Sequence, residues 1–236
     1  MFDRSLDVNG FEVRARYTRR TVAEVLEPLC GLMSGLNARA GRPLVVLMAA
    51  PPGAGKSTLA QALAMLSRPT RTAAVGMDGF HYPAAYLAAH RDGAGRPLVD
   101  IKGAPETYDV AALAALLDRL NLPDQRWPLY DRRIHDPVPE AVEIREQILI
   151  VEGNWLLLDE APWRDLRCDY SIFLRAGDAR QLERIVQRKM MGGYGEEAAR
   201  VFVRENDWPN IQRCMAHSRR GDLNLAPALD GTLEVI

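Results

Sequence analysis

Apolar residues gather in short runs that are spaced along the chain. PLVVLMAA (43–50), QILIVEG (147–153) and CDYSIFLR (168–175) are largely apolar, and RTAAVGMD (71–78) is a further run that ends in an aspartate. A strand that is apolar on both sides is typical of the interior of a parallel sheet, where helices cover both faces. The runs therefore predict central, buried strands.

Segments with helical periodicity separate these runs. Apolar residues recur every three or four positions in 57–66, 109–120, 178–190 and 196–207. An aspartate, which is a favoured N-cap residue, stands at the start of the second and the third of these segments. Buried strands that alternate with helices predict an α/β fold with a mostly parallel sheet.

The N-terminal part has a pattern of its own. FEVRARY (11–17) alternates apolar and polar residues, which predicts a half-buried strand. Apolar residues at helical spacing predict an amphipathic helix over 21–40, with Pro28 as a candidate kink. We expect residues 1–42 to pack this strand and helix on a core formed by residues 43–236. A homodimer, in which the helix packs on a second copy of the chain, is the alternative.

Composition narrows the class of protein. The chain has 236 residues, of which 47% are hydrophobic, so it can bury one sizeable core. Its formal net charge of −1 offers no basic field to nucleic acid or to an anionic membrane, and we expect neither as a partner. No apolar run approaches the roughly 20 residues that cross a bilayer. The opening MFDRSLDVNG lacks the pattern of a signal peptide, so we expect a cytoplasmic protein.

The spacing of the cysteines also favours a cytoplasmic location. Cys30, Cys168 and Cys214 are far apart in sequence and form no C-x-x-C pair. A reduced protein without a cysteine-based zinc site fits this spacing best.

The turn after the first buried run matches a phosphate-binding loop. APPGAGKS (50–57) fits the relaxed P-loop pattern, with alanine where the strict pattern has glycine. In such loops backbone N–H groups surround a phosphate, the lysine bridges the β- and γ-phosphates of a nucleotide, and the serine hydroxyl binds Mg²⁺. The predicted ATP-binding residues are Pro52, Gly53, Ala54, Gly55, Lys56, Ser57 and Thr58, with Ser57 also at the metal. An ordinary strand-to-helix turn is the alternative.

Two acidic residues end buried runs at the same predicted edge of the sheet. Asp78 closes the run 71–78, and its position predicts a base that accepts the proton of a substrate hydroxyl. A helix N-cap or a ligand of Mg²⁺-bound water is the alternative for Asp78. Glu152 closes the run 147–153 in the manner of a Walker-B acid, suited to the hydration shell of Mg²⁺ or to the acceptor. A strand-end cap is the alternative for Glu152.

Arginines in the third helical segment share one face. Arg180, Arg184 and Arg188 are spaced at i, i+4 and i+8, and the glycine-rich break GGYG follows at 192–195. A hinged lid, here expected around 178–207, can place arginines on the transferring phosphoryl group and exclude water. Arg184 and Arg188 are therefore catalytic candidates, and a solvated, ion-paired helix face is the alternative.

Further motifs follow the phosphate loop in a fixed order. They are VGMDGFHYP (75–83), KGAPETYDV (102–110), YDRRIHDP (130–137) and ILIVEGNWLLLD (148–159). Together they resemble the uridine kinase, pantothenate kinase and phosphoribulokinase superfamily over about residues 43–220, and especially a bacterial branch of sugar-transport-associated kinases. The resemblance implies a P-loop NTPase fold, which is a three-layer α/β/α sandwich with a mostly parallel central sheet and a helical lid.

The resemblance also implies roles for single residues. Asp78 matches the catalytic base of the family, and Glu152 matches its strand-end acid. The residues that match or adjoin the acceptor-site motifs, and that we expect to line one substrate pocket, are Tyr130, His135, His81 and Tyr82.

The motif around the expected acceptor site departs from that of uridine kinases. Asp136 replaces the usual serine, and Arg132-Arg133-Ile134 is also unlike it. The two arginines are compatible with an anionic acceptor, and the alternative is that they are ordinary surface arginines, which are common in this chain. The expected function is transfer of the γ-phosphoryl group of ATP, with Mg²⁺, to a hydroxyl of a small metabolite, which can be a nucleoside, a pantothenate-like acid or a sugar. An ATP-binding regulatory NTPase that acts with a protein partner is the alternative.

Overall fold

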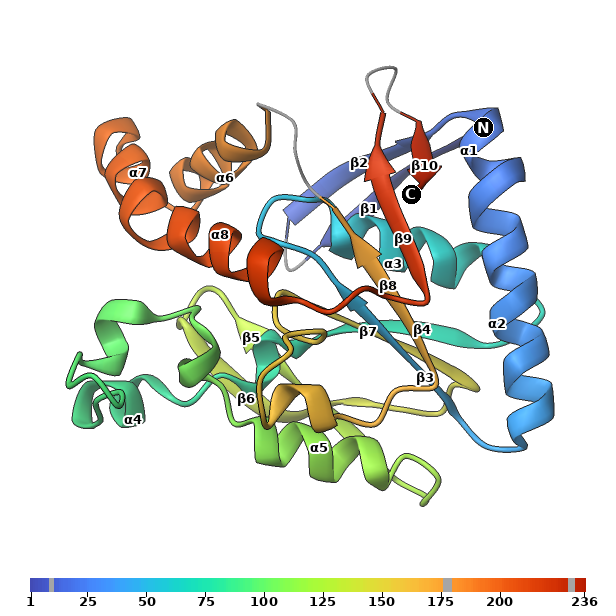
Figure 1. The fold of residues 1–236 in the computed structure, drawn as a ribbon, viewed down its shortest axis with the longest axis horizontal. Helices are drawn as coiled ribbons and strands as arrows, with labels where there is room; N and C mark the ends of the chain where they lie inside the picture. Colours follow the sequence, from blue (N-terminus) through green and yellow to red (C-terminus); the bar gives the residue numbers. More distant parts are fainter. Residues whose placement is uncertain (9–10, 176–179, 229–231) are drawn as a thin grey trace.

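The computed structural model describes residues 1–8, 11–175, 180–228 and 232–236 (Figure 1). Their centre is a six-stranded sheet with the strand order β10-β9-β8-β3-β7-β4. The strands are β3 (Leu44–Ala49), β4 (Thr72–Gly76), β7 (Ile148–Gly153), β8 (Tyr170–Leu174), β9 (Leu223–Pro227) and β10 (Leu233–Val235). All neighbours pair in parallel except β10, which pairs antiparallel with β9 at the edge. The buried strands predicted from the apolar runs are confirmed as β3, β4, β7 and β8.

Helices cover both faces of this sheet. α2 (Glu27–Ala40) and α3 (Lys56–Leu66) share one apolar cluster with Val46 of β3. α5 (Val110–Asp118) shares the cluster on the other face with Val45. Successive side chains of a strand point to opposite faces, so a strand that is apolar throughout is buried on both sides. The predicted three-layer α/β/α sandwich is therefore confirmed.

A helical lid lies beside the sheet, at the upper left of Figure 1. It consists of α6 (Arg180–Met191), α7 (Glu196–Phe202) and α8 (Trp208–His217), and a π-helical turn over Val203–Asp207 joins α7 to α8. The lid has its own apolar cluster, formed by Ile185, Val186, Ala199, Val203 and Ile211. Residues 178 and 179 of the predicted lid lie outside the described residues. The helical segment that was predicted to end at 207 continues to His217.

The N-terminal strands form a separate hairpin. β1 (Phe2–Val8) and β2 (Phe11–Tyr17) pair antiparallel. The sequence predicted β2 but not β1. The cluster that attaches the hairpin to α3 consists of Phe2, Leu6, Ala15 and Ala62. The N-terminal strands thus pack on the helix that begins at the phosphate loop.

One helical segment connects this hairpin to the sheet. It comprises α1 (Arg19–Thr21), a π-helical turn over Val22–Leu26, and α2. Pro28 lies in the first turn of α2, directly after the π-helical turn. Because proline lacks an N–H group, it interrupts the α-helical hydrogen-bond pattern, and this position lets the segment remain helical on both sides.

A second hairpin, which the sequence did not predict, carries the YDRRIHDP motif. β5 (Arg126–Asp131) and β6 (Asp136–Glu143) pair antiparallel. β5 passes very close to the 3₁₀ turn Met77–Phe80, since a Cβ at Gly79 would lie 2.1 Å from the carbonyl oxygen of Pro128. Only glycine permits this close approach. The crossing brings the hairpin next to the end of β4.

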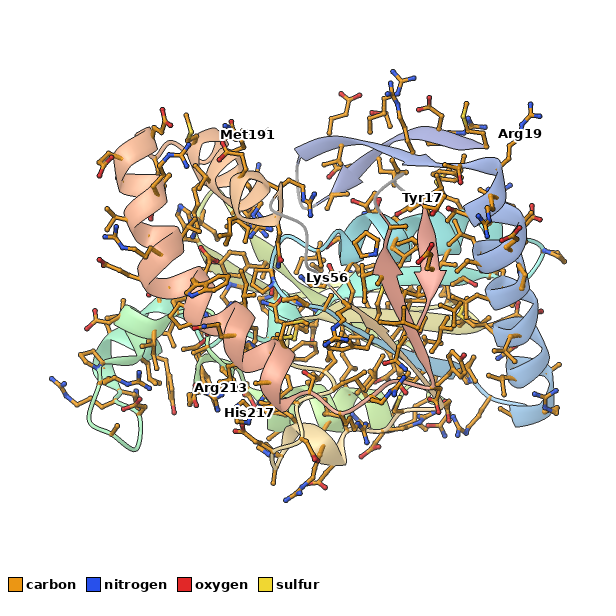
Figure 2. All side chains as sticks on the ribbon, turned by 45° about the horizontal axis from the view of Figure 1, so that its top comes forward. Tyr17, Arg19, Lys56, Met191, Arg213 and His217 are labelled. Carbon is orange, nitrogen blue, oxygen red and sulfur yellow. The ribbon has the colours of Figure 1, made fainter. Side chains whose placement is uncertain are left out.

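Short helical elements complete the fold. They are α4 (Ala84–Ala89) and the 3₁₀ turns Leu98–Ile101, Pro105–Thr107 and Trp163–Asp165. Arg213 of α8, labelled in Figure 2, pairs with Glu106 at 2.7 Å and with Glu160 at 2.8 Å and so ties the lid's last helix to these elements. Among the helices of the described residues, none combines the length and the apolar character that a membrane crossing requires.

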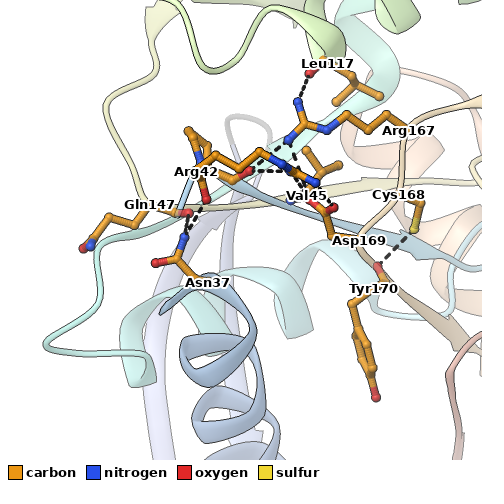
Figure 3. A network of polar contacts seen from close by, with 10 residues as sticks. Asn37, Arg42, Val45, Leu117, Gln147, Arg167, Cys168, Asp169 and Tyr170 are labelled. Atoms are coloured by element: carbon orange, nitrogen blue, oxygen red, sulfur yellow. Dashed lines mark hydrogen bonds and ion pairs between the residues drawn. The ribbon is translucent and has the colours of Figure 1, made fainter. Parts of the chain in front are cut away.

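A polar network joins the amino ends of β3 and β8 (Figure 3). The carboxylate of Asp169 accepts hydrogen bonds from Arg42 at 2.8 and 2.6 Å and from the backbone N–H of Val45 at 2.8 Å. Arg167 lies 3.7 Å from the same carboxylate. Burial opposes the charge of Asp169, but the bonds from Arg42 and Val45 outweigh it and hold the pKa below its usual value. The carboxyl ends of the strands, at the opposite edge, are left for the candidate site.

Candidate phosphotransfer site

The phosphate loop connects β3 to α3 at the carboxyl edge of the sheet. Gly53 and Gly55 have φ angles of 75° and 91°, which glycine adopts readily, and α3 begins at Lys56. All predicted nucleotide-binding residues, 52–58, lie in this loop or in the first turn of α3. The strand, the turn and the helix start together form an arrangement that binds phosphate through backbone N–H groups. Lys56 lies in the middle of the molecule, between the lid and the N-terminal region (Figure 2).

Glu152 lies at the end of β7, beside the first turn of α3. Ser57 Oγ donates a hydrogen bond of 2.6 Å to Glu152 Oε1, and Lys56 Nζ lies 4.0 Å from Glu152 Oε2. Burial raises the pKa of the Glu152 carboxyl, against the lowering effects of Lys56 and of the bond from Ser57. The buried carboxylate is thus only partly compensated by its neighbours.

The oxygen atoms of Ser57 and Glu152 form a pair of candidate ligands for Mg²⁺. Within the described residues, no group of three or more His, Cys, Asp or Glu side chains could hold a metal ion. Mg²⁺ at phosphate-transfer sites takes one or two protein ligands and completes its shell with water and phosphate oxygens. A hydroxyl and an undercompensated carboxylate at the phosphate loop meet this requirement. These residues can hold Mg²⁺ together with a bound phosphate.

Asp78 lies in the 3₁₀ turn that directly follows β4. Its Oδ1 accepts a hydrogen bond of 3.3 Å from the Tyr108 hydroxyl, and its Oδ2 lies 3.7 Å from Nη2 of Arg132. Burial alone would raise the pKa of Asp78, but surrounding groups outweigh it and hold the pKa below its usual value. The groups that lower it are His81, Arg132, Lys56 and Arg188. The side chain is 39% exposed, so this charged carboxylate remains accessible.

His81 is buried next to Asp78 and stacks on Tyr108, with ring centroids 3.8 Å apart. Burial lowers the pKa of His81 from 6.5 to about 4, although Asp78 acts in the opposite direction. The imidazole is therefore neutral near pH 7. Its Nδ1 lies 3.2 Å from the carbonyl oxygen of Thr107, which can only accept, so Nδ1 carries the proton and Nε2 is the acceptor.

The other predicted acceptor-site residues are separated by the structure. The ring of Tyr130 lies 5.5 Å from that of His81, so Tyr130 belongs to the group around Asp78. Lys102 Nζ lies 5.1 Å from the centre of the Tyr130 ring and donates a hydrogen bond of 2.8 Å to the backbone carbonyl of His135. The side chain of His135 itself is exposed.

Tyr82 turns to a different surface. Its ring stacks on that of Tyr86 at 4.2 Å, and its side chain lines a hollow of about 320 Å³ that also includes Trp163 and Arg213. The contacts of the described residues do not bring Tyr82 to Asp78. Tyr108, which stacks on His81 and also lines this hollow, lies beside Asp78 in its place.

The lid is docked on the phosphate loop. Gln181 Nε2 donates a hydrogen bond of 2.6 Å to the carbonyl oxygen of Pro52, and Arg184 Nε donates one of 3.0 Å to that of Gly53. A Cβ at Gly53 would lie 2.8 Å from Cγ1 of Ile185, so only glycine permits this contact. The lid thus contacts the backbone of the phosphate loop directly.

The two lid arginines that the sequence singled out differ in their surroundings. Arg184 is exposed and bonds the loop backbone, whereas Arg188 is half-buried. Burial and Arg132 lower the pKa of Arg188, and Asp207, Asp78 and Glu152 act in the opposite direction. Arg188 is therefore the arginine whose charge acts on the two carboxylates of the site. The side chain of Arg180 lies outside the described part of the structure.

Some residues of the site were missed at the level of sequence. Tyr108 and Lys102 lie in the KGAPETYDV motif, and the resemblance of this motif to the kinase family was a signal that they belong to the site. Gln181 had no such signal, because an amide in a helical segment is as compatible with solvent as with a buried contact.

Known proteins with similar sequences include kinases. No family model matches the chain. The chain is 40% identical over 225 residues to the uncharacterized protein YggC of Escherichia coli, and 92% of each chain is covered. A putative uridine kinase of Schizosaccharomyces pombe is 31% identical, over 71% of this chain and 76% of its own length. A pantothenate kinase of Streptomyces coelicolor is 35% identical over 62% of this chain, which spans half of that protein.

A solved structure agrees in fold as well as in sequence. A putative fructose transport system kinase from a Silicibacter species superimposes with a TM-score of 0.76 at 33% identity, covering 85% of this chain and 98% of the other. These similarities confirm the family resemblance of the motifs. Kinases of this family generally use ATP and Mg²⁺. The chain belongs to the superfamily of P-loop kinases that includes the uridine and pantothenate kinases, and it is a small-molecule kinase.

Proposed function

We propose that the protein transfers the γ-phosphoryl group of ATP to a hydroxyl group of a small metabolite, with Asp78 as the general base. The observation that carries the proposal is the position of this carboxylate. It is charged, 39% exposed, and set at the same sheet edge as the phosphate loop and Glu152. Such a group can orient an acceptor hydroxyl toward a γ-phosphate and take its proton.

The proposed step conserves atoms and charge in a simple way. The acceptor oxygen attacks the γ-phosphorus, and the bond from this phosphorus to the β–γ bridging oxygen breaks. The acceptor proton passes to Asp78, and the products are ADP and a phosphate ester. Lys56 and the backbone N–H groups of residues 53–57 bind the β- and γ-phosphates, while Arg188 stabilises the charge that develops on the transferring group.

Ser57 and Glu152 would hold Mg²⁺ together with phosphate oxygens. The ion supplies positive charge to the β- and γ-phosphates when it is bound. The hydrogen bond from Ser57 Oγ to Glu152 Oε1 orients both oxygens at the start of α3. Arg184 and Gln181 would keep the lid on the loop during the reaction and exclude water.

The names of the relatives supply the first acceptors to test. They are uridine, pantothenate and fructose, each of which offers a hydroxyl group. The similarity does not choose among them, because a few side chains of the acceptor pocket decide specificity.

Removal of the base tests the proposal. Asp78→Asn is expected to lower the rate of acceptor-dependent ADP formation by about 10²- to 10⁴-fold, the usual contribution of a general base. Binding of a non-hydrolysable ATP analogue, measured by calorimetry, should persist. Asp118→Asn changes an exposed carboxylate on α5 and should behave as the wild type. Normal turnover of the Asp78 variant would exclude its role as the base.

A further inference from the structure

Arg132 projects into the site from the turn of the β5–β6 hairpin. Its Nη2 lies 3.7 Å from Asp78 Oδ2, which is an ion pair but longer than a hydrogen bond. Its Nε is buried and has no hydrogen-bond partner among the described residues. A buried donor without a partner is costly and therefore rare in folded proteins. The guanidinium thus has donors that Asp78 does not use.

The neighbouring arginine shows that this arrangement is specific to position 132. The side chain of Arg133 is 89% exposed and makes hydrogen bonds of 3.0 and 2.6 Å to Asp131. It is an ordinary surface ion pair. The side chain of Arg132 is only 32% exposed and points to the candidate base instead.

The charge around Asp78 on this side is positive in excess. Arg132 and Lys102 both carry a fixed positive charge, and Lys102 Nζ lies 5.1 Å from the centre of the Tyr130 ring. His81 adds no charge near pH 7, because burial lowers its pKa to about 4. Among these residues, Asp78 supplies the negative charge. An additional anion would therefore be stabilised here.

Arg132 comes from a different element than the positive side chains at the phosphate loop. Lys56 begins α3 and Arg188 belongs to the lid, and Arg132 is near enough to Arg188 to lower its pKa. Arg132 directly follows β5, the strand that carries the candidate acceptor-site residue Tyr130, and its Nη2 lies 3.7 Å from Asp78 Oδ2. Its free donors are therefore available to the acceptor.

We infer, on the basis of the proposed function, that the acceptor bears an anionic group close to the hydroxyl that is phosphorylated and that Arg132 binds this group. The anionic group is a carboxylate or a phosphate, since the guanidinium matches the paired oxygens of both. A neutral oxygen could accept the hydrogen bond from the buried Nε, but it would not balance the positive charge of the guanidinium. Because Arg132 contacts Asp78, the anionic group and the reacting hydroxyl belong to neighbouring parts of one small molecule.

Matched pairs of compounds test this inference. The pairs are glycerate and glycerol, pantothenate and pantothenyl alcohol, and fructose 1-phosphate and fructose. Affinity is measured by calorimetry with a non-hydrolysable ATP analogue and Mg²⁺, and turnover by ADP formation with ATP. In at least one pair the anionic member should bind at least about tenfold more tightly, the effect of one hydrogen bond to a charged group. The first two pairs test a carboxylate and the third a phosphate. The inference is wrong if no pair shows this preference.

Variants at two adjacent arginines test the assigned residue. Arg132→Gln should weaken binding of the preferred anionic compound at least about tenfold and leave the affinity for the ATP analogue nearly unchanged. Arg133→Gln, the matched control, should change neither. Arg132→Lys keeps the charge but loses the planar fork, so an intermediate affinity is expected, and this variant replaces the first if thermal unfolding shows that Arg132→Gln does not fold. An equal loss for the anionic and neutral members of a pair would mean that Arg132 only supports Asp78.

The outcomes separate this inference from the proposed reaction. If a neutral acceptor is phosphorylated more efficiently than every anionic compound, the kinase reaction stands and the anionic acceptor is excluded. If an anionic compound binds selectively through Arg132 but no ADP forms, the binding inference stands and the proposed phosphoryl transfer fails.

Discussion

At the scale of single residues, the pKa values of two carboxyl groups at the carboxyl ends of the strands are shifted in opposite directions. Asp78 has a lowered pKa because positive groups outweigh its burial, whereas burial raises the pKa of Glu152. Groups whose surroundings push their pKa values apart can take different roles in one reaction. The charged, accessible Asp78 suits proton acceptance, and the buried Glu152 beside Ser57 suits the metal.

His81 offers a test of the surroundings of Asp78. Its pKa is lowered from 6.5 to about 4, so between these pH values the unfolded chain binds the proton more readily than the folded one. The free energy of unfolding should therefore fall as the pH decreases from 6.5 to 4, by up to about 3 kcal/mol from this residue. His81→Gln should lose this share of the acid sensitivity in urea unfolding, while His135→Gln, at an exposed site, should keep it. Unchanged acid sensitivity of the first variant would contradict the burial of a neutral imidazole.

At the scale of elements, periodicity predicted what is buried on a regular face. β3 and β7 were recognised as continuous apolar runs and α5 by its helical periodicity, because all three are buried in a large core. The hairpin β5–β6 was missed because prolines and charges interrupt its alternation and it forms a sheet of only two strands. The continuation of the lid through α8 was missed because Pro209 suggests an end, whereas it lies in the first turn of a helix that follows a π-helical turn.

The contact between α6 and the phosphate loop leads to a prediction about lid closure. Gly53→Ala would place a methyl group 2.8 Å from Cγ1 of Ile185 and should hold the lid away from the loop. We expect kcat/KM for ATP to fall by about tenfold or more, since the two lid-to-loop hydrogen bonds would be lost. Proteolysis at the lid turn 192–195 should become faster in the presence of nucleotide.

Gly41→Ala is the control for backbone strain in that experiment. Gly41 also has a positive φ, of 62°, but a Cβ there would contact nothing within 4 Å. The variant should lose stability and keep its kinetics. Equal kinetic losses in both variants would show that strain, and not lid contact, is responsible.

At the scale of the whole molecule, the carboxyl ends and the amino ends of the central strands differ in the residues that they bring together. The carboxyl edge collects residues from the phosphate loop, the 3₁₀ turn after β4, the β5–β6 hairpin and the lid. The amino edge is joined by the network around Asp169 (Figure 3). Substitutions at the amino ends of the strands should therefore lower stability, whereas substitutions at the carboxyl ends should lower activity.

Asp169→Ala tests this separation. The change leaves Arg42 and the N–H group of Val45 without their acceptor and should lower the free energy of unfolding by about 1–3 kcal/mol. The kcat of the folded variant should match that of the wild type, because the network lies at the edge opposite to Asp78. Asp118→Ala, at an exposed carboxylate, should change neither quantity. A large loss of kcat would show that the two edges are coupled.

The sequence by itself determined the phosphate loop, the central strands and the family, because these depend on local patterns that are read along the chain. It also predicted that Asp78 and Glu152 lie at the same edge of the sheet, since the ends of parallel strands meet there. Only the tertiary structure decided which side chains surround Asp78. Tyr108, Arg132 and Arg188 come from three distant segments, and their distances depend on how a hairpin crosses a turn and how a lid packs, which no local pattern encodes.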